Sequence, residues 1–393
     1  MIEKRKRNRL HVNFLGMYVM LLPIATSLSG LLGNISFINY VAVLYLLVAS
    51  FAQGLNFNFY GRNALVYVYY VYFMMSLLWG SQVSFNWYLV TTLMNMLVTF
   101  IALSDHYSER ELTFLKKSVV VSFVILFALA LMNIESIKTY RLTIKLFSEM
   151  DPNDFACGLS LLIALALERL ANKKKILSSI VLLLLSGMLI VFSGSRGAML
   201  MFAGMFGVWF LVVSRKRWKG AVLAVAILAI GLVVLYKSLP EFLQGRLDIV
   251  GAISGGGSGR TAIWKAAFEK FAGSNLFRMF FGYGYGNFAG AVNYIAPGHT
   301  SAYTSHNMFV NALIEGGIIG LTIMLAMFFQ AFVYALKRKN MFGYLPLIGL
   351  MISGCTLDTQ AYRIFGMVFI VAFIFVGGKN ERKKISVNHR SGI

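Results

Sequence analysis

The sequence predicts an all-α, polytopic membrane protein with about twelve transmembrane helices and one large outer-face loop between spans 9 and 10. Of its 393 residues, 58% are hydrophobic and only 13% are charged, whereas a soluble domain carries roughly 25% charged residues. A membrane-spanning helix needs roughly 20 apolar residues, so twelve would use about 240 residues, close to the hydrophobic fraction. This composition excludes a soluble enzyme, a disulfide-stapled secreted domain and a disordered chain.

Twelve apolar runs account for the predicted helices. They lie at about 14–32, 35–54, 64–79, 87–103, 118–132, 155–170, 176–192, 197–213, 220–236, 308–335, 342–356 and 364–377. The basic residues from Lys4 to Arg9 precede a run that is long enough to stay in the membrane, so we expect no cleaved signal peptide. The whole chain, 1–393, is then a single integral-membrane domain.

The distribution of basic residues predicts the orientation. Short cytoplasmic loops are enriched in Lys and Arg, and most of the 36 basic residues fall on the segments that share a side with the N-terminus. We therefore expect a multi-pass protein with both termini in the cytoplasm. The net charge of +21 then reflects topology and contacts with anionic membrane lipids, and it does not indicate nucleic-acid binding.

One connection, 237–305, is far longer than the others and falls on the outer face. It contains a Gly/Ser stretch at 251–259, a predicted helix from 260 to about 273 and a Gly-rich turn at 282–286. Loops longer than about 12–15 residues are commonly functional, so we expect the site on this face. Neither glycine segment matches a phosphate-binding loop or a dinucleotide fingerprint.

Two arginines on the outer face are candidates for binding an anion. Arg196 lies in a Ser-Gly-Ser-Arg-Gly turn, where small residues, exposed amides and a helix start favour a phosphate. Arg260 begins the predicted loop helix. The alternatives are an arginine that reaches lipid headgroups at the first position and a solvated loop charge at the second.

His306 lies where the long loop re-enters the membrane, and an imidazole with a pKa near 6.5 can act as a general base. Behind it, Asn307, Asn311 and Glu315 recur at a spacing of four residues, on one stripe of an apolar helix. Polar groups in membrane helices usually face a cavity or a partner helix. The stripe therefore predicts an outer-facing polar cavity, and the alternative is a structural histidine.

Two further segments leave two interpretations open. The run 151–154, Asp-Pro-Asn-Asp, is a good helix start, and it is also a candidate part of a site. Asp358 and Arg363 lie between the last two runs and either pair with each other or line the same cavity.

The sequence contains no residue spacing typical of a metal site, and we expect no cofactor. Cys157 and Cys355 both lie in apolar runs and are expected to be small buried hydrophobic residues. Ser195 lacks the Gly-x-Ser-x-Gly pattern of a serine hydrolase.

The order and spacing of these motifs resemble those of the O-antigen ligase and polysaccharide polymerase superfamily. The matching segments are 193–198, 260–264, 281–286 and 304–320, and 151–154 looks like a segment of the polymerase members. The resemblance covers about 150–335, the ligase- or polymerase-like core, and the layout of the spans extends it to the whole chain. It implies a metal-independent membrane glycosyltransferase of the C-type architecture, which takes glycans from an undecaprenyl-diphosphate donor on the outer leaflet.

The resemblance also implies roles for individual residues. The arginines of the Ser-Arg turn and of the loop helix bind the diphosphate, which corresponds to Arg196 and Arg260 here. The histidine of the His-Asn motif activates the acceptor, which corresponds to His306. The substrate-binding candidates are Ser195, Asn307, Asn311 and Glu315. Direct displacement at the anomeric carbon would invert its configuration.

These inferences favour a polymerase of the bacterial cytoplasmic membrane that links lipid-borne repeat units into O-antigen, capsule or exopolysaccharide. Its expected partners are the undecaprenyl-diphosphate oligosaccharide donor, a glycan acceptor and a separate chain-length regulator. The alternatives are an O-antigen ligase or protein O-oligosaccharyltransferase of the same fold, a polysaccharide or lipid transporter, and a non-catalytic assembly partner. Transporters usually have two related halves with midplane sites, whereas these candidates gather on the outer face of the second half.

Overall fold

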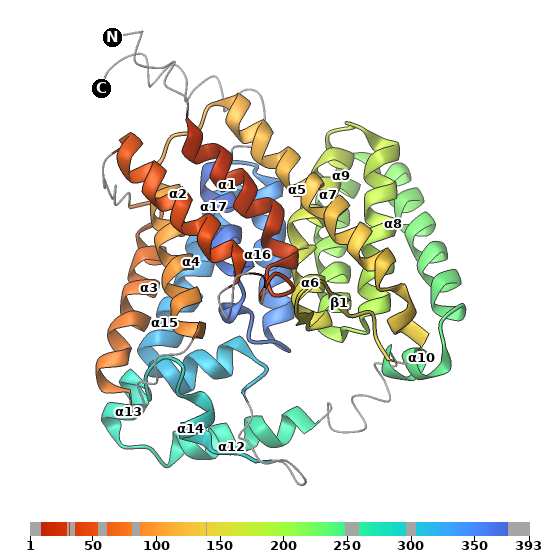
Figure 1. The fold of residues 1–393 in the computed structure, drawn as a ribbon. Helices are drawn as coiled ribbons and strands as arrows, with labels where there is room; N and C mark the ends of the chain where they lie inside the picture. Colours follow the sequence, from red (N-terminus) through yellow and green to blue (C-terminus); the bar gives the residue numbers. More distant parts are fainter. Residues whose placement is uncertain are drawn as a thin grey trace, which may run out of the picture.

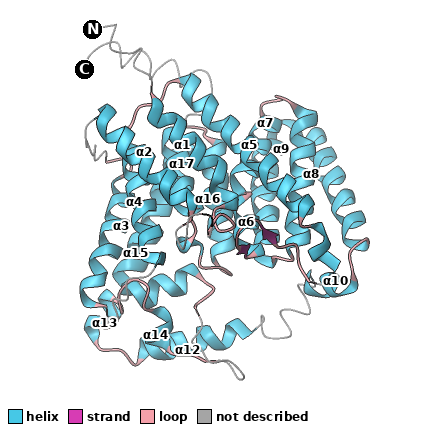
Figure 2. Ribbon diagram, viewed as in Figure 1, coloured by secondary structure: helices cyan, strands magenta, loops and turns pink. Residues whose placement is uncertain are grey.

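The computed structural model describes residues 9–29, 31, 36–53, 61–80, 87–138, 140–247, 259–295 and 304–375. Almost all regular structure in these residues is helical, as Figure 2 shows. The exception is a pair of short antiparallel strands, β1 (Ile144–Lys145) and β2 (Glu149–Met150). The predicted all-α class is confirmed.

The five N-terminal helices coincide with the first five predicted spans. They are α1 (Leu10–Leu21, continued by η2, Leu22–Ile24), α2 (Phe37–Gln53), α3 (Ala64–Met75, continued by η3, Ser76–Trp79), α4 (Trp87–Ser104) and α5 (Glu109–Met132). α5 begins with a capping box, in which the Ser108 hydroxyl accepts from the backbone amide of Glu111 and the Glu111 carboxylate accepts from that of Ser108. A short 3-10 helix, η4 (Ile134–Lys138), follows it.

The middle of the chain contains a helix that is longer than the sequence predicts. Its elements are α6 (Pro152–Gly158), α7 (Ser160–Ala171), α8 (Ile176–Ser193), α9 (Arg196–Lys237) and α10 (Glu241–Leu247). α9 continues through the basic segment 214–219, where we expected a break between two spans. A straight helix of this length would extend about 63 Å, yet Gly231 packs on Leu184 in the middle of α8. The later part of α9 therefore returns along α8 to α10 (Figure 1), which fits two passes.

The C-terminal part contains the long loop and the last three predicted spans. Its elements are α12 (Arg260–Ala272), α13 (Leu276–Phe281), α14 (Phe288–Val292), α15 (Met308–Lys337), α16 (Met341–Gly354), η6 (Thr359–Ala361) and α17 (Ile364–Ile374). α10 and α12 to α14 lie at the end of the bundle opposite the starts of α1 and α5 (Figure 1). The loop helix from Arg260 is confirmed, whereas 251–258 lies outside the described residues.

Several helices are apolar enough to cross a membrane. Within the described ranges, the long ones are Glu109–Met132, Ile176–Ser193, Arg196–Val213 and Met308–Lys337. The shorter apolar ones are Leu10–Ile24, Phe37–Ala52, Ala64–Trp79, Leu89–Ser104, Met341–Gly354 and Ile364–Ile374. They indicate a multi-pass membrane protein, while the number of twelve spans and the orientation stay predictions.

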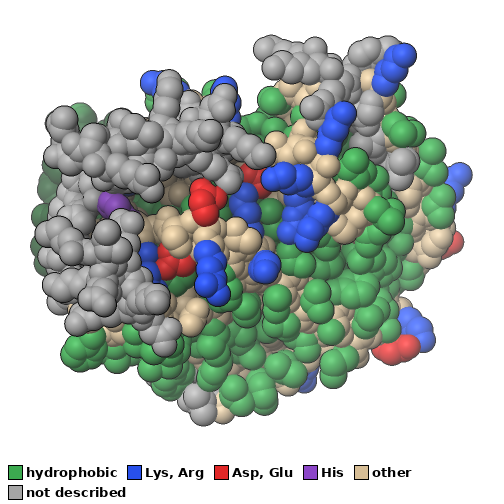
Figure 3. Space-filling model, turned by 90° about the horizontal axis from the view of Figure 1, so that it is seen from above, with side chains coloured by type: hydrophobic (Ala, Val, Ile, Leu, Met, Phe, Trp, Pro, Cys, Tyr) green, Lys and Arg blue, Asp and Glu red, His purple; other side chains and the backbone are tan. Residues whose placement is uncertain are grey.

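Glycines allow the central helix α16 to approach its neighbours closely. Gly204 of α9 faces Ile352 of α16, and Gly349 of α16 faces Met205 of α9, as is typical of helix contacts in membranes. Large apolar side chains such as Phe51 and Phe329 are exposed on the outside. Figure 3 shows this apolar surface on the flanks, with Lys and Arg side chains gathered on the end where α1 and α5 begin.

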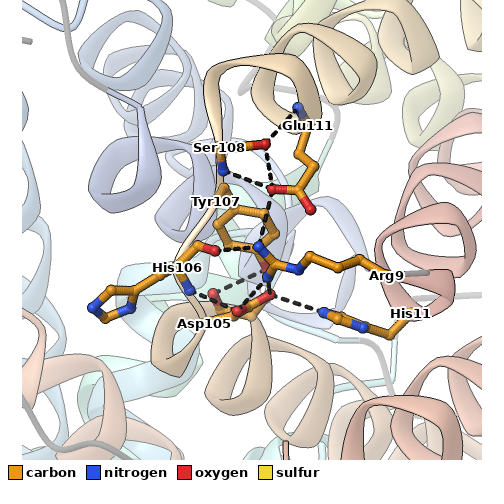
Figure 4. Close-up of polar contacts among 8 residues, drawn as sticks. Arg9, His11, Asp105, His106, Tyr107, Ser108 and Glu111 are labelled. Atoms are coloured by element: carbon orange, nitrogen blue, oxygen red, sulfur yellow. Dashed lines mark hydrogen bonds and ion pairs between the residues drawn. The ribbon is translucent and has the colours of Figure 1, made fainter. Parts of the chain in front are cut away.

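A charged cluster at that end joins α1 to the connection between α4 and α5 (Figure 4). Arg9 donates from Nη2 to both carboxylate oxygens of Asp105, at 2.6 and 2.5 Å, and from Nη1 to Glu111, at 3.0 Å. His11 Nε2 lies 3.0 Å from the same Asp105 carboxylate. The cluster holds the start of α1 against segments about a hundred residues away.

Candidate active site

The turn 305–307 positions His306 at the start of α15. The carboxylate of Asp358 accepts hydrogen bonds from the backbone amides of His306, at 3.1 Å, and Asn307, at 3.0 Å, and from the Ser305 hydroxyl. His306 has a φ of 48°, a conformation that few non-glycine residues adopt and that is common at functional sites. Asp358 therefore holds the backbone that carries the imidazole.

Asn307 connects this turn to the helix behind it. Its Oδ1 accepts from the amides of Phe309, at 2.9 Å, and Val310, at 3.2 Å, and it thereby caps α15. Its Nδ2 donates to the carbonyl of Cys355, at 3.1 Å. The predicted substrate-binding residue Asn307 thus fixes both the helix start and the contact with the connection after α16.

An apolar cluster places the Arg260 end of α12 near His306. Ile263 and Ala267 of α12 pack with Val310 and Ile314 of α15 and with Phe288 of α14. In addition, Trp264 Nε1 donates to the carbonyl of Ser305, at 2.8 Å. α12 is therefore attached directly to the turn that carries the imidazole.

The surroundings of His306 keep its imidazole neutral at neutral pH. Burial is the largest effect and lowers the pKa of His306 below its ordinary value of 6.5. The carboxylates of Asp358 and Asp151 oppose this shift, and the positive charge of Arg260 adds to it. A neutral imidazole is the form that can accept a proton.

The Ser-Arg turn lies against the same connection after α16. Gly194 has a φ of 59°, and Ser195, which is buried, caps α9 by accepting from the amide of Ala198, at 3.4 Å. A Cβ added at Gly197 would lie 2.2 Å from Thr356 Oγ1. The start of α9, with Arg196 as its first residue, therefore packs on Thr356, two residues before Asp358.

Arg141 ties two of the predicted segments together, and the sequence analysis did not identify it. Its buried guanidinium donates from Nε to the carbonyl of Ser193 and from Nη2 to Asn153 Oδ1, at 3.2 Å. Asp151 accepts from the amide of Asn153, at 2.6 Å, which confirms that it caps α6. No motif marks Arg141, because its partners lie elsewhere in the chain.

The inner part of the polar stripe holds the Gly-rich turn. Asn311 and Glu315 are both buried. Glu315 Oε1 accepts from the amide of Phe288, at 3.2 Å, and the Glu315 carbonyl accepts from the amide of Gly284, at 2.9 Å. Glu315 thus anchors the loop on α15, and the assignment of both residues to substrate binding stays a prediction.

The remaining expectations are resolved in part. Asp358 and Arg363 form no ion pair in the described structure, because Asp358 binds the His306 turn and Arg363 donates to other side chains.

Cys157 is buried as expected, but Cys355 is exposed because α16 ends one residue before it. Among the residues that the structure describes, no group of three or more His, Cys, Asp or Glu could hold a metal ion.

Comparison with known proteins agrees with the motifs. Residues 180–325 match the family model described as O-antigen ligase, a segment that contains Arg196, Arg260 and His306. No curated protein matches the chain. The match supports the resemblance to the O-antigen ligase and polymerase superfamily, and the apolar helices indicate a multi-pass membrane protein.

Proposed function

We propose that this chain polymerises undecaprenyl-diphosphate-linked oligosaccharide repeat units into a surface polysaccharide on the outer leaflet of the bacterial cytoplasmic membrane. The observation that carries the proposal is the arrangement around the connection 355–358. This connection packs on the Arg196 turn at Thr356 and binds the His306 turn through Asp358. Arg260 acts electrostatically on the same imidazole.

In the proposed reaction, an acceptor hydroxyl attacks the anomeric carbon of the donor glycan. His306 accepts the proton of this hydroxyl as the new carbon–oxygen bond forms. The bond between the anomeric carbon and the diphosphate oxygen breaks, and the diphosphate leaves with its electron pair. Attack from the opposite side inverts the configuration of the carbon.

The leaving diphosphate requires fixed positive charge. Arg196 and Arg260 can each form bidentate hydrogen bonds to phosphate oxygens, so we expect the reaction to need no metal ion. Removing one preorganised charge-stabilising donor lowers kcat by about 10²–10³, and removing a general base lowers the rate by about 10²–10⁴.

The polymerase differs from the alternatives in its acceptor. A polymerase uses a second lipid-linked repeat unit, whereas a ligase or protein O-oligosaccharyltransferase uses a different molecule. The segment 151–154 favours the polymerase, because it looks like a segment of the polymerase members.

A reaction in proteoliposomes tests the proposal. Purified protein is supplied with a short undecaprenyl-diphosphate oligosaccharide, and the products are separated on a gel. A ladder at repeat-unit spacing, lost in Arg196→Ala and His306→Ala, is the expected result. The matched controls are Arg110→Ala and His106→Ala, since both side chains are exposed at the opposite end of the bundle.

Other outcomes contradict the proposal in distinct ways. A single transfer that occurs only when a separate acceptor is added identifies a ligase. No turnover with either acceptor, in protein with the wild-type melting temperature, favours a transporter. A full ladder in all four variants identifies a different active site.

A further inference from the structure

Arg363 is an incompletely satisfied arginine at the start of α17. Its Nη2 donates to Asn39 Oδ1 and Thr91 Oγ1, both at 3.4 Å, and its Nε is buried without a hydrogen-bond partner. Distances of 3.4 Å exceed the usual range for N–H···O hydrogen bonds. An arginine at the membrane edge that lacks a close counter-charge is a candidate functional residue.

The charges around Arg363 do not neutralise it at close range. No carboxylate of the described residues lies within the 4.0 Å that defines an ion pair with its guanidinium. The acidic group that acts on it is Asp154, whose carboxylate accepts from the Thr26 hydroxyl, at 3.4 Å. Arg363 therefore keeps unused hydrogen-bond donors, and no carboxylate in contact with it neutralises its positive charge.

The walls around Arg363 are polar groups that satisfy one another. The Tyr18 hydroxyl donates to Asn95 Oδ1, at 2.8 Å, and Asn95 Nδ2 donates to the carbonyl of Tyr362, at 3.3 Å. Tyr18 and Asn95 are buried, whereas Arg363 is only half-buried. Arg363 is thus partly accessible although its Nε is buried, and the neighbouring polar groups bind one another, so an anion would supply the missing acceptors.

The position of Arg363 relates this charge to the candidate active site. The hairpin 355–363 contacts the Arg196 turn at Thr356 and the His306 turn at Asp358, and it ends at Arg363. Arg363 lies five positions after Asp358, so their Cα atoms are at most about 18 Å apart. In the order of the hairpin, Asp358, which binds the His306 turn, lies between Thr356, which contacts the Arg196 turn, and Arg363.

We propose that Arg363, with Asn39 and Thr91 beside it, binds the phosphate of the second lipid-linked substrate, the acceptor. This inference rests on the proposed polymerase function. The acceptor carries its own diphosphate at one end of the glycan, while its attacking hydroxyl lies on a sugar further along. An enzyme that joins two such molecules needs a second anion site, separated from the donor diphosphate by the position of the base.

A binding measurement tests the anion site without turnover. The probe is radiolabelled farnesyl diphosphate, which carries a diphosphate and a short prenyl chain but no sugar, added to purified protein in detergent. We expect two equivalents bound to wild type and to Arg110→Gln, and one to either Arg363→Gln or Arg196→Gln. Bound probe that is the same in Arg363→Gln and wild type overturns the proposal.

A competition arm identifies the source of the phosphate. Farnesol and inorganic pyrophosphate are each added to the Arg196→Gln protein, which retains the Arg363 site. Weak competition by both supports a phosphate that is joined to a lipid. Displacement by pyrophosphate at the probe's own affinity identifies a free anion as the ligand and overturns the acceptor assignment.

A kinetic measurement assigns the site to one substrate. The acceptor is a lipid-linked repeat unit whose anomeric oxygen is replaced by methylene, so that it accepts a glycan but cannot donate one. In Arg363→Gln we expect KM for this acceptor to rise by about 10- to 100-fold, with KM for the donor unchanged. Arg363→Lys keeps the charge and should show a smaller rise. An equal rise with a phosphate-free acceptor, or a rise in donor KM alone, overturns the proposal.

The two measurements separate this inference from the function on which it rests. If wild-type protein binds two probe equivalents but transfers no glycan, the polymerase function fails and the anion site stands. If it polymerises with one equivalent bound, the polymerase function stands and the second site fails. Melting temperatures near wild type in Arg363→Gln and Arg363→Lys exclude unfolding as the cause.

Discussion

Replacing Asp358 by asparagine tests whether this carboxylate positions His306. Asp358 accepts from the amides of His306 and Asn307 and from the Ser305 hydroxyl, using both of its oxygens. Asparagine has nearly the same size, but one of its terminal groups is an NH₂ donor, so it cannot accept at both positions. Asp358→Asn therefore changes hydrogen bonding and charge with little change in packing.

The size of the effect follows from these contacts. A hydrogen bond to a charged group contributes about 1.5–3 kcal/mol, and here the bonds hold His306 at a φ of 48°. If these bonds no longer stabilise the backbone conformation that places the imidazole, kcat/KM falls by about 10- to 100-fold. The carboxylate also raises the pKa of His306, so its removal lowers this pKa further and moves the acidic limb of the pH–rate profile to lower pH.

The assay is the initial rate of glycan transfer in proteoliposomes across the acidic pH range, together with the melting temperature. Glu269→Gln is the matched control, because Glu269 is an exposed carboxylate on α12 with a distant partner, Lys265, at 3.9 Å. A rate in Asp358→Asn close to that of wild type, with an unshifted acidic limb, would refute the positioning of His306 by Asp358.

Further predictions concern the base, the turns and the metal requirement. In wild type the neutral imidazole of His306 is fully present above pH 6.5 and is lost as pH falls through its lowered pKa, so a pH–rate profile should fall to half below 6.5. Arg141→Met leaves the Ser193 carbonyl without its donor, and a melting curve should show a loss of about 1–3 kcal/mol. Gly282→Ala and Gly286→Ala both place a side chain at a φ of 75°, but only the first brings a Cβ within 2.3 Å of a backbone oxygen, that of Glu315. Gly286→Ala should therefore cost about 1–2 kcal/mol and Gly282→Ala clearly more, and equal melting temperatures would contradict this. Chelation with EDTA should leave the transfer rate unchanged, and a loss restored by a divalent cation would show that the arginines do not suffice.

The helices were predictable because hydrophobicity along the chain is a local signal. Each predicted run contains described helix, and the loop helix begins at Arg260 as expected. The exception is α9, whose helical backbone continues through 214–219 although the later part of the helix returns along α8. That segment is rich in Arg and Lys and lacks proline, and these residues favour helix, so the charge that marks a loop in a membrane protein does not end the helix.

Only those residues of the candidate site whose residue type and position in the sequence indicate a role could be predicted. Arg196, Arg260 and His306 were identified from residue type and position. The contacts of Asp358 with His306 and of Arg141 with Ser193 each join residues 52 positions apart, and no periodicity encodes them. The contact of Arg9 with Asp105, 96 positions apart, is similar.

The placement of Asn311 and Glu315 shows why the candidate residues form one unit. α15 follows directly after His306, carries the apolar partners of α12 in its first two turns, and carries Glu315, which accepts from the amide of Phe288. The loop that delivers Arg260 is thus attached to the helix that delivers His306. The hairpin 355–363 adds Arg196 on one side through Thr356 and Arg363 on the other. Because a single helix and a single hairpin set these positions, a displacement of either would move the charges and the base together.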